Sequence, residues 1–379
     1  MDPILRHIRH QREALIALLA SLVEVESPSD DATAVGRFVE LVSDTLAPMG
    51  SIRKHAGGTF GPHLSCEMRL PGRRKNGQVL VLGHSDTVWP LGTLRSMPFR
   101  RARGRLWGPG VLDMKAGIAS FVFAVRALGE LEIPVPSRVL LQLNSDEEVG
   151  SPSSRTLTET NARASRAVLV LEPGTGLSGK LKTARKGVGV FAVTVHGRAA
   201  HAGVDFSAGA SAVLELARQI QRIAGFTNPE RGITVNPGVI AGGTRSNVIA
   251  ETARAEVDVR VPRLRDAASL ERKFHRLGAF DTRCRVEVSG GLNRPPMERT
   301  PGTVRLFRLA QELGAGMGVT VEESHSGGGS DGNFTAALGV PTLDGLGAAG
   351  EGAHAANENI LINRIADRTA LLAKLLAAL

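Results

Sequence analysis

The sequence predicts an α/β protein with a mostly parallel sheet flanked by helices, into which a smaller ferredoxin-like α+β domain is inserted. Two observations carry this prediction. A chain of 379 residues is too long for one ordinary core. The hydrophobic pattern also changes near residue 186, from alternating helix and strand stretches to a strand-rich segment. We therefore expect a discontinuous domain over 1–185 and 299–379, and an inserted domain over 186–298.

The first segment alternates between helical and extended patterns. Apolar residues in 32–49 recur with helical spacing, because Val35, Phe38, Val39 and Val42 share one face. The runs 138–143 and 166–171 are apolar throughout, which is typical of strands covered on both faces. The predicted helices are 4–26, 32–49 and 113–129, and the predicted strands are 63–70, 78–82, 138–143 and 166–171.

The inserted segment has the order β-α-β-β-α-β, which is the ferredoxin-like split unit. Its predicted elements are strand 188–195, helix 208–223, strands 233–241 and 247–261, helix 267–277 and strand 283–288. Pro295-Pro296 closes the segment, since proline ends both helices and strands. Beyond it we expect a helix over 303–313, a glycine-rich loop at 327–331 and a last helix over 364–379.

Composition bounds the class of protein. Hydrophobic residues make up 42% and charged residues 22%, as in soluble globular proteins, and no apolar run approaches the roughly 20 residues that span a bilayer. Arg6, Arg9 and Arg12 before an apolar stretch imitate a signal peptide. The helical spacing of the apolar residues favours an amphipathic helix instead.

The number of cysteines bears on the cellular compartment of the protein, and its charge bears on its binding partners. Cys66 and Cys284 are too few and too distant for a disulfide framework, so we expect a cytoplasmic setting, with the periplasm left open. The net charge of +9 is carried by scattered arginines, aromatics are only 4%, and tyrosine is absent. Stacking platforms for bases are scarce, so we expect anionic small substrates and neither nucleic acid nor membrane as partners.

The most informative short pattern is Gly83-His84-Ser85-Asp86, which follows the apolar strand 78–82. A strand repeats every two residues, so His84 and Asp86 point to the same side. A carboxylate that orients an imidazole is how proteins prepare a histidine as a metal ligand. The pattern therefore suggests one corner of a metal site.

Further acidic and histidine residues share this placement, after an apolar strand or in a glycine-rich turn. They are Asp113, Glu147, Glu148, Glu172 and His354. Taken singly, Asp113 would be a helix cap, the two glutamates a solvated turn and His354 an ordinary loop residue. Because parallel strand ends meet at one edge of a sheet, their joint placement favours a shared site. Histidines mixed with carboxylates suit zinc, cobalt or manganese, with two ions sharing a carboxylate.

Six motifs occur in the order seen in M20 metallopeptidases, and they resemble the glutamate carboxypeptidases most. They are Gly83-His-Ser-Asp-Thr-Val88, Gly108-Pro-Gly-Val-Leu-Asp-Met-Lys-Ala-Gly117, Asp146-Glu-Glu-Val-Gly150, Leu171-Glu-Pro173, Gly197-Arg-Ala-Ala-His-Ala-Gly203 and Gly327-Gly-Gly-Ser-Asp331. The resemblance runs over nearly the whole chain. It implies a phosphorylase/hydrolase-like fold of the zinc-peptidase type.

The resemblance also implies roles for the strand-end residues. His84 and Glu172 would bind one Zn²⁺, and Glu148 and His354 a second, with Co²⁺ or Mn²⁺ as alternatives. Asp113 would bridge the two ions. Asp86 would orient His84, and Glu147 would be the general base.

In the inserted domain the resemblance singles out His201, which would stabilise the reacting carbonyl in the partner subunit of a homodimer. Asn247 and Arg260 would bind the substrate carbonyl and terminal carboxylate, and Arg294 a side-chain carboxylate of the substrate. The inserted domain would thus act in dimerisation and as a lid. The alternatives are a capping role for His201 and an outward-facing strand position for Arg260.

The function predicted from these residues is a di-zinc hydrolase that cleaves an amide bond and releases a C-terminal amino acid, with glutamate as a candidate. Its substrate would be a peptide or an N-acyl amino acid. The alternative is an N-acyl amino acid deacylase of the acetylornithine or succinyl-diaminopimelate type. A non-catalytic amino acid or peptide binder would be expected to have lost the base or a ligand, and all of them are present.

Overall fold

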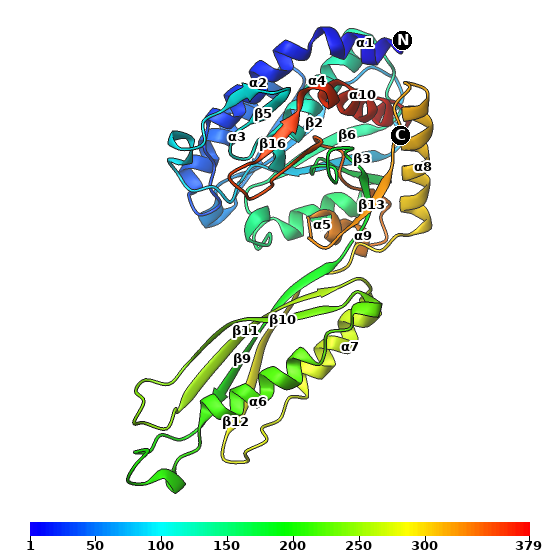
Figure 1. The fold of residues 1–379 in the computed structure, drawn as a ribbon. Coiled ribbons are helices and arrows are strands. Elements are labelled where there is room, and N and C mark those ends of the chain that lie inside the picture. Colours follow the sequence, from blue (N-terminus) through cyan, green and yellow to red (C-terminus); the bar gives the residue numbers. More distant parts are fainter. The chain divides into compact units, whose positions relative to one another are not determined.

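The computed structural model describes residues 1–379 and divides into two compact units (Figure 1). The first comprises Met1–Ala184, Arg299–Ser326 and Ser330–Leu379. The second comprises Arg185–Glu298 and Gly327–Gly329. The chain therefore leaves the first unit, builds the second and returns.

A six-stranded sheet forms the centre of the first unit, with strand order β1-β2-β6-β3-β7-β14. Strands β6, β3, β7 and β14 run parallel, whereas β1 and β2 pair antiparallel at one edge. The strands are β1 (Gly50–His55), β2 (His63–Met68), β3 (Gln78–His84), β6 (Arg138–Asn144), β7 (Ala167–Val170) and β14 (Thr342–Leu343). The sheet is thus mixed, with a parallel centre.

Both faces of the sheet centre are buried. Along β3, Val79 and Val81 belong to the large core, whereas Leu80 and Leu82 belong to a smaller core on the other face. Alternate residues of a strand point to opposite faces, so an apolar run without polar breaks is what this burial requires. The helices of this unit are α1 (Pro3–His10), α2 (Arg12–Glu24), α3 (Ala32–Leu46), α4 (Ala116–Glu130), α5 (Arg155–Arg163), α8 (Pro301–Ala315), α9 (Gly332–Ala337) and α10 (Ile362–Ala378).

Two small sheets complete the first unit. One has the order β15-β16-β5-β4 and the other pairs β13 with β8. Their strands are β4 (Arg100–Ala102), β5 (Arg105–Trp107), β8 (Leu181–Arg185), β13 (Glu323–Ser326), β15 (Gly350–Glu351) and β16 (Asn359–Leu361). The pairing of β16 with β5 brings the C-terminal third of the chain beside the segment that precedes Asp113.

The second unit is an antiparallel four-stranded sheet of order β10-β11-β9-β12 with helices α6 and α7 along one face (Figure 1). Its elements are β9 (Gly187–His196), α6 (Ala212–Ala224), β10 (Thr234–Gly242), β11 (Thr252–Val261), α7 (Leu264–His275) and β12 (Arg285–Arg294). This chain and strand order is ferredoxin-like. Phe191 of β9 stacks on Phe274 of α7, with ring centroids 4.0 Å apart, inside a separate core.

Several predicted boundaries were wrong. The predicted helix 4–26 is broken at Gln11, where α1 ends and α2 begins. The predicted helix 113–129 starts only at Ala116, because Val111–Lys115 forms a wide turn in which Asp113 is extended. Helix α6 starts four residues later than predicted, where Ser211 caps it. The strand predicted over 247–261 starts at Thr252. No helix in the structure combines the length and the apolar character needed to cross a membrane.

Candidate metal centre

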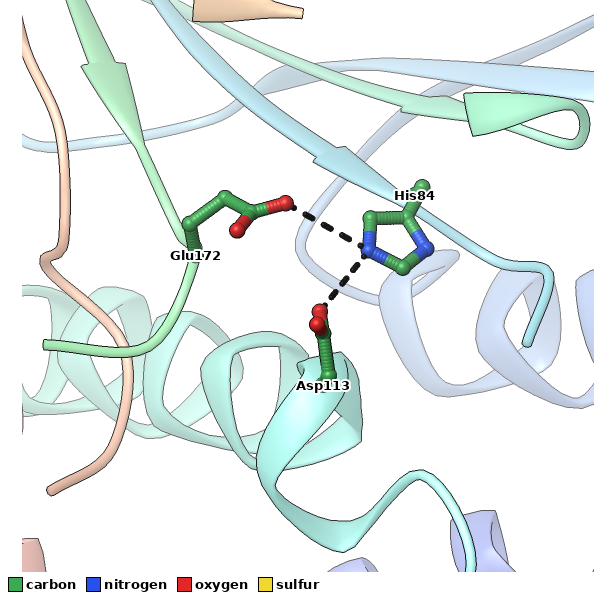
Figure 2. Close-up of side chains that lie close together, drawn as sticks. All are labelled: His84, Asp113 and Glu172. Carbon is green, nitrogen blue, oxygen red and sulfur yellow. Dashed lines mark hydrogen bonds and ion pairs between the residues drawn. The ribbon is translucent and has the colours of Figure 1, made fainter. Parts of the chain in front are cut away.

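His84 is the last residue of β3, and its imidazole faces two carboxylates. Its Nε2 lies 3.2 Å from Oδ1 of Asp113 and 3.6 Å from Oε1 of Glu172 (Figure 2). His84 and Glu172 are both buried; His84 ends β3, and Glu172 follows the neighbouring parallel strand β7. Adjacent parallel strand ends therefore deliver two ligand-type groups to one point.

A second group of the same composition adjoins the first. Nε2 of His354 lies 3.4 Å from Oδ2 of Asp113 and 3.3 Å from Oε2 of Glu148. Glu148 follows β6, the neighbour of β3 on its other side. Asp113 thus turns one carboxylate oxygen towards each histidine and belongs to both triplets, His84–Asp113–Glu172 and Asp113–Glu148–His354.

The residues of both triplets fit divalent metal ions. Ligand atoms on a tetrahedral zinc ion, with bonds of about 2.0 Å, stand about 3.3 Å apart, which matches the four separations given above. Imidazole nitrogen and carboxylate oxygen are also the donors that zinc, cobalt and manganese accept. In addition, Oε1 of Glu148 is buried without a hydrogen-bond partner. A buried acceptor of this kind calls for a cation or a donor.

The protonation equilibria show how strongly the cluster attracts positive charge. Hydrogen bonds to Asp113 and Glu148 raise the pKa of His354 to about 10. Burial alone would lower the pKa of His84, but its hydrogen bonds to Asp113, Asp86 and Glu172 raise it well above the ordinary value. Burial raises the pKa of Glu148, whereas bonds to both histidines overcome burial and lower the pKa of Asp113. Without metal, the imidazoles therefore take up protons that bound ions would replace.

Asp86 lies directly behind His84. Nδ1 of His84 is 2.9 Å from the backbone carbonyl of Asp86 and 3.4 Å from its Oδ1. The same carboxylate accepts hydrogen bonds from the backbone N–H groups of Glu147 and Glu148, at 3.2 and 3.1 Å. Asp86 therefore contacts both His84 and the turn that follows β6, which goes beyond the orienting role expected from the sequence.

Glu147 belongs to neither triplet and is half-buried beside them. It opens the short 3₁₀ turn Glu147–Val149, so its side chain leaves the backbone in a different direction from that of Glu148. Its negative charge helps raise the pKa of His84. One glutamate of the pair therefore lies among the candidate ligands while the other lies within electrostatic range of them.

His201 and Asn247 belong to the second unit and lie on two adjacent loops. The backbone N–H of Ala202 donates to the carbonyl of Asn247 at 3.0 Å. Nδ1 of the exposed His201 accepts from the N–H of Gly203 at 3.1 Å, so a neutral ring carries its proton on Nε2. Because Ser211 caps α6, His201 has no capping role there. A hollow of about 850 Å³ adjoins these loops.

Arg260 and Arg294 lie in one transverse row of the second sheet. Both are paired with Val188 of β9, Arg260 from β11 and Arg294 from β12. Arg260 is partly exposed and its guanidinium binds the carboxylate of Asp258 at 2.9 Å. Arg294 is buried, and a side chain at Gly329 would collide with it. The glycine-rich loop therefore passes close to the Arg294 side chain.

Three buried residues around the centre are missing from the predicted site, although Asp331 ends one of the six motifs. Glu358 is buried and accepts backbone hydrogen bonds from the Asp113 turn. Asp331 is buried and binds the side chains of Asn144 and Ser151 on either side of the Glu147–Glu148 turn. His63 is buried on β2, and its Nδ1 accepts the N–H of Ser145 at 3.1 Å. Their partners are distant in sequence, so only the fold reveals them.

An α/β unit that gathers histidine and carboxylate side chains at parallel strand ends, with one carboxylate shared by two triplets, has the architecture of a metal-dependent hydrolase. The family model "Peptidase family M20/M25/M40" matches residues 80–378, so the chain belongs to this family of hydrolytic metallopeptidases. The resemblance to M20 peptidases inferred from the motifs is confirmed.

Individual relatives agree with this assignment. The chain is 29% identical to carboxypeptidase G2 of Pseudomonas sp. (strain RS-16), over 97% of this chain and 89% of that protein. It is also 29% identical to a succinyl-diaminopimelate desuccinylase of Cereibacter sphaeroides, over 78% and 81% of the two chains. Among solved structures, aminopeptidase PepT from Bacillus cereus superposes with a TM-score of 0.82 at 22% identity, covering 97% and 98% of the chains. The last comparison shows a shared fold.

Proposed function

We propose that this protein is a two-metal amide hydrolase that releases a C-terminal amino acid from a peptide or an N-acyl amino acid. The observation that carries the proposal is the position of Asp113, whose two carboxylate oxygens face the two histidines. A carboxylate placed this way would serve two divalent ions, as in two-metal hydrolases. We propose Zn²⁺ as the ion, two per subunit, with Co²⁺ or Mn²⁺ as substitutes.

In this proposal His84 and Glu172 would hold one ion, Glu148 and His354 would hold the other, and Asp113 would serve both. Bound ions would polarise the scissile carbonyl and acidify the attacking water. Asp86 keeps Nδ1 of His84 occupied, so Nε2 remains available towards the cluster. These side chains would thereby set the positions of the scissile carbonyl oxygen and of the attacking water.

Glu147 is the proposed general base. Its carboxylate takes a proton from the attacking water as the carbon–oxygen bond forms, and passes that proton to the amine nitrogen as the carbon–nitrogen bond breaks. The backbone N–H of Glu147 is held by Asp86, so the base and the His84 ligand share one support. A fixed base of this kind contributes about 10²–10⁴-fold to such a reaction.

The second unit would recognise the substrate. Arg260 presents a fork that matches a carboxylate, and a substrate carboxylate would compete with Asp258 for it. Asn247 would bind the substrate carbonyl, and Nε2–H of His201 would donate to the oxygen that becomes negative during attack. Arg294 would support a side-chain carboxylate of the substrate.

We also propose a homodimer formed through the second unit, in which His201 serves the partner's centre. Strand β10 is at the edge of its sheet, and Val239 and Ile240 are 59% and 64% exposed there. Val213 and Leu214 on α6 are exposed as well. An apolar edge strand is a surface that proteins normally cover.

The dimer proposal is tested with Ile240→Lys, which places a charge at the edge of β10. Light scattering after gel filtration should show a dimer for the parent protein and a monomer for the variant. Leu264→Lys, at an exposed apolar residue that begins α7, is the matched control and should stay dimeric. A parent protein that is monomeric at all concentrations would refute the dimer.

Two relatives suggest two substrate types, so the decisive experiment is a substrate panel on zinc-loaded protein. We expect acyl-glutamates and peptides with a C-terminal glutamate to be cleaved faster than N-succinyl-diaminopimelate or N-acetylornithine. A reversed order would favour the deacylase alternative. Purified protein that binds neither zinc nor cobalt and shows no hydrolysis would instead indicate the non-catalytic binder.

We also propose a cytoplasmic setting for this protein. Both of its cysteines are buried and form no disulfide, which is compatible with a reducing compartment.

A further inference from the structure

Glu358 is a buried carboxylate that the proposed reaction does not use. It is 0% exposed, and each of its oxygens accepts two hydrogen bonds. Oε1 accepts from the backbone N–H groups of Leu112 at 2.8 Å and Asp113 at 3.0 Å. Oε2 accepts from the N–H of Gly110 and from Nε1–H of Trp89, both at 2.8 Å. Because it accepts four hydrogen bonds, this carboxylate is fixed in its position in the fold.

Three of the four donors belong to the turn that carries Asp113. In this turn Gly110 has a φ of 68°, and Asp113 is extended with a φ of −115°. The backbone therefore leaves helical geometry, and its N–H groups find no acceptor within the following helix. Glu358 supplies that acceptor, and it contacts the N–H of Asp113 itself. Without this contact, two buried donors and one partly buried donor would lack their partner.

Glu358 also belongs to the segment that carries His354. The N–H of Glu358 donates to the carbonyl of Ala355, and the N–H of Ala355 donates to that of Gly352, both at 2.9 Å. His354 lies within this turn with a φ of 61°, a conformation that the surrounding bonds must maintain. One side chain thus connects the backbone of Asp113 to the loop of His354.

We propose that Glu358 is a positioning residue, which holds the turn of Asp113 and the loop of His354 in register so that the Asp113–Glu148–His354 triplet can bind its ion. It acts through Asp113 and His354 and touches neither substrate nor reacting atoms. The other triplet shares Asp113, but its two remaining residues, His84 and Glu172, lie at the ends of buried strands of the central sheet, so it depends on Glu358 less. The inference rests on the proposed metal-dependent function.

The test is Glu358→Gln, which keeps the shape but turns an amide NH₂ towards N–H donors. Zinc and cobalt binding to metal-free protein is measured by calorimetry with a competing chelator. Groups that support metal ligands from behind typically contribute 10–100-fold to affinity. We expect one binding step to lose about 10–100-fold and the other to change less than about threefold. At saturating metal, kcat should recover most of its value while KM stays unchanged.

Trp89→Phe is the matched control. It removes one donor from Glu358 but leaves all three backbone N–H groups bound, so both affinities should stay within about twofold of the parent values. If Glu358→Gln does not fold, Glu358→Asp replaces it, because it keeps the charge and withdraws the acceptors by one methylene. We expect the same selective loss from that variant.

The outcomes separate this inference from the proposed function. If the parent protein binds two ions and a folded Glu358→Gln variant binds both as tightly, the inference is wrong and the function stands. Equal weakening of both steps would also refute the selective role. If the parent protein binds neither zinc nor cobalt, the proposed function fails first, and the inference fails with it.

Discussion

The two units use their sheets differently. The central sheet of the first unit is buried on both faces, and its candidate chemistry lies where parallel strands end. The second sheet is covered by α6 and α7 on one face only, and the alternating pattern of β11 places Arg260 on the open face. Strand ends gather side chains into one small volume, whereas an open face spreads them in rows. The first arrangement suits metal binding, and the second leaves side chains such as Arg260 accessible on one face of the sheet.

The largest expected effect tests the chemical half of this comparison. Glu147→Gln should lower kcat by about 10²–10⁴-fold, because the amide cannot accept a proton from water. Metal content, measured by elemental analysis, should remain that of the parent, since Glu147 belongs to neither triplet. A variant with near-normal kcat would show that another group is the base.

The second prediction asks whether the two cores are energetically separate. Phe274→Ala removes a ring that is stacked on Phe191 in the core of the second unit. It should lower the free energy of unfolding of that unit by about 3–5 kcal/mol. Zinc affinity should stay unchanged, because all candidate ligands lie in the first unit. Urea unfolding followed by circular dichroism, together with metal titration, checks both statements, and a coupled loss of zinc would contradict the separation.

The third prediction has a smaller expected effect and tests the proposed substrate binding by Arg260. Arg260→Ala should raise KM for a substrate with a free C-terminal carboxylate by about 10–100-fold, as expected for a lost charge-assisted pair. The value of kcat should change little. The matched control is the same substrate with its carboxylate amidated, for which parent and variant should have similar KM. If Arg260→Ala leaves KM of the free acid unchanged, the arginine is only a partner of Asp258.

The smallest effect is a pH dependence confined to the first unit. Burial lowers the pKa of His63, whose Nδ1 accepts a hydrogen bond and so requires a neutral ring. Above the ordinary histidine pKa, the His63 ring is neutral in both the folded and the unfolded chain, and its contribution to stability is complete. As the pH falls towards the lowered value, the unfolded chain binds a proton first, and stability is lost.

The measurement is urea unfolding of metal-saturated protein at pH 7.5, 6.5 and 5.5, compared with His63→Asn. The asparagine oxygen can accept from the N–H of Ser145 but does not titrate in this range. We expect the parent to lose more stability than the variant between pH 6.5 and 5.5. Parallel pH profiles for the two proteins would refute the role of His63.

Much of the centre was predictable because its signals are local. The apolar run before His84, and the runs before Glu148 and Glu172, identify strand exits, and strand exits of a parallel sheet converge. The motif resemblance then led to the M20 family, which the family match confirms. The roles of the individual residues stay predictions, because geometry shows that they meet and not what they do.

Other features depend on contacts that no local pattern encodes. Arg368 looks like a solvated residue of the last helix, yet it is buried and donates to the carbonyls of Gly179, Gly345 and Gly347. Burial lowers its pKa to about 9. The break of the predicted helix at 113–115 has the same origin, since its backbone donors are satisfied by Glu358 from 245 residues away in sequence.

The sequence by itself therefore determined the fold class, the family and the set of candidate ligands, because periodicity and short motifs are read within a few residues. Only the tertiary structure decided that Asp113 faces both histidines and that Arg260 and Arg294 share a row. It also decided that Glu358, in the segment of His354, accepts hydrogen bonds from the turn of Asp113. Those facts depend on buried hydrogen bonds and strand register between distant segments. Such bonds become necessary only after folding removes the polar groups from water.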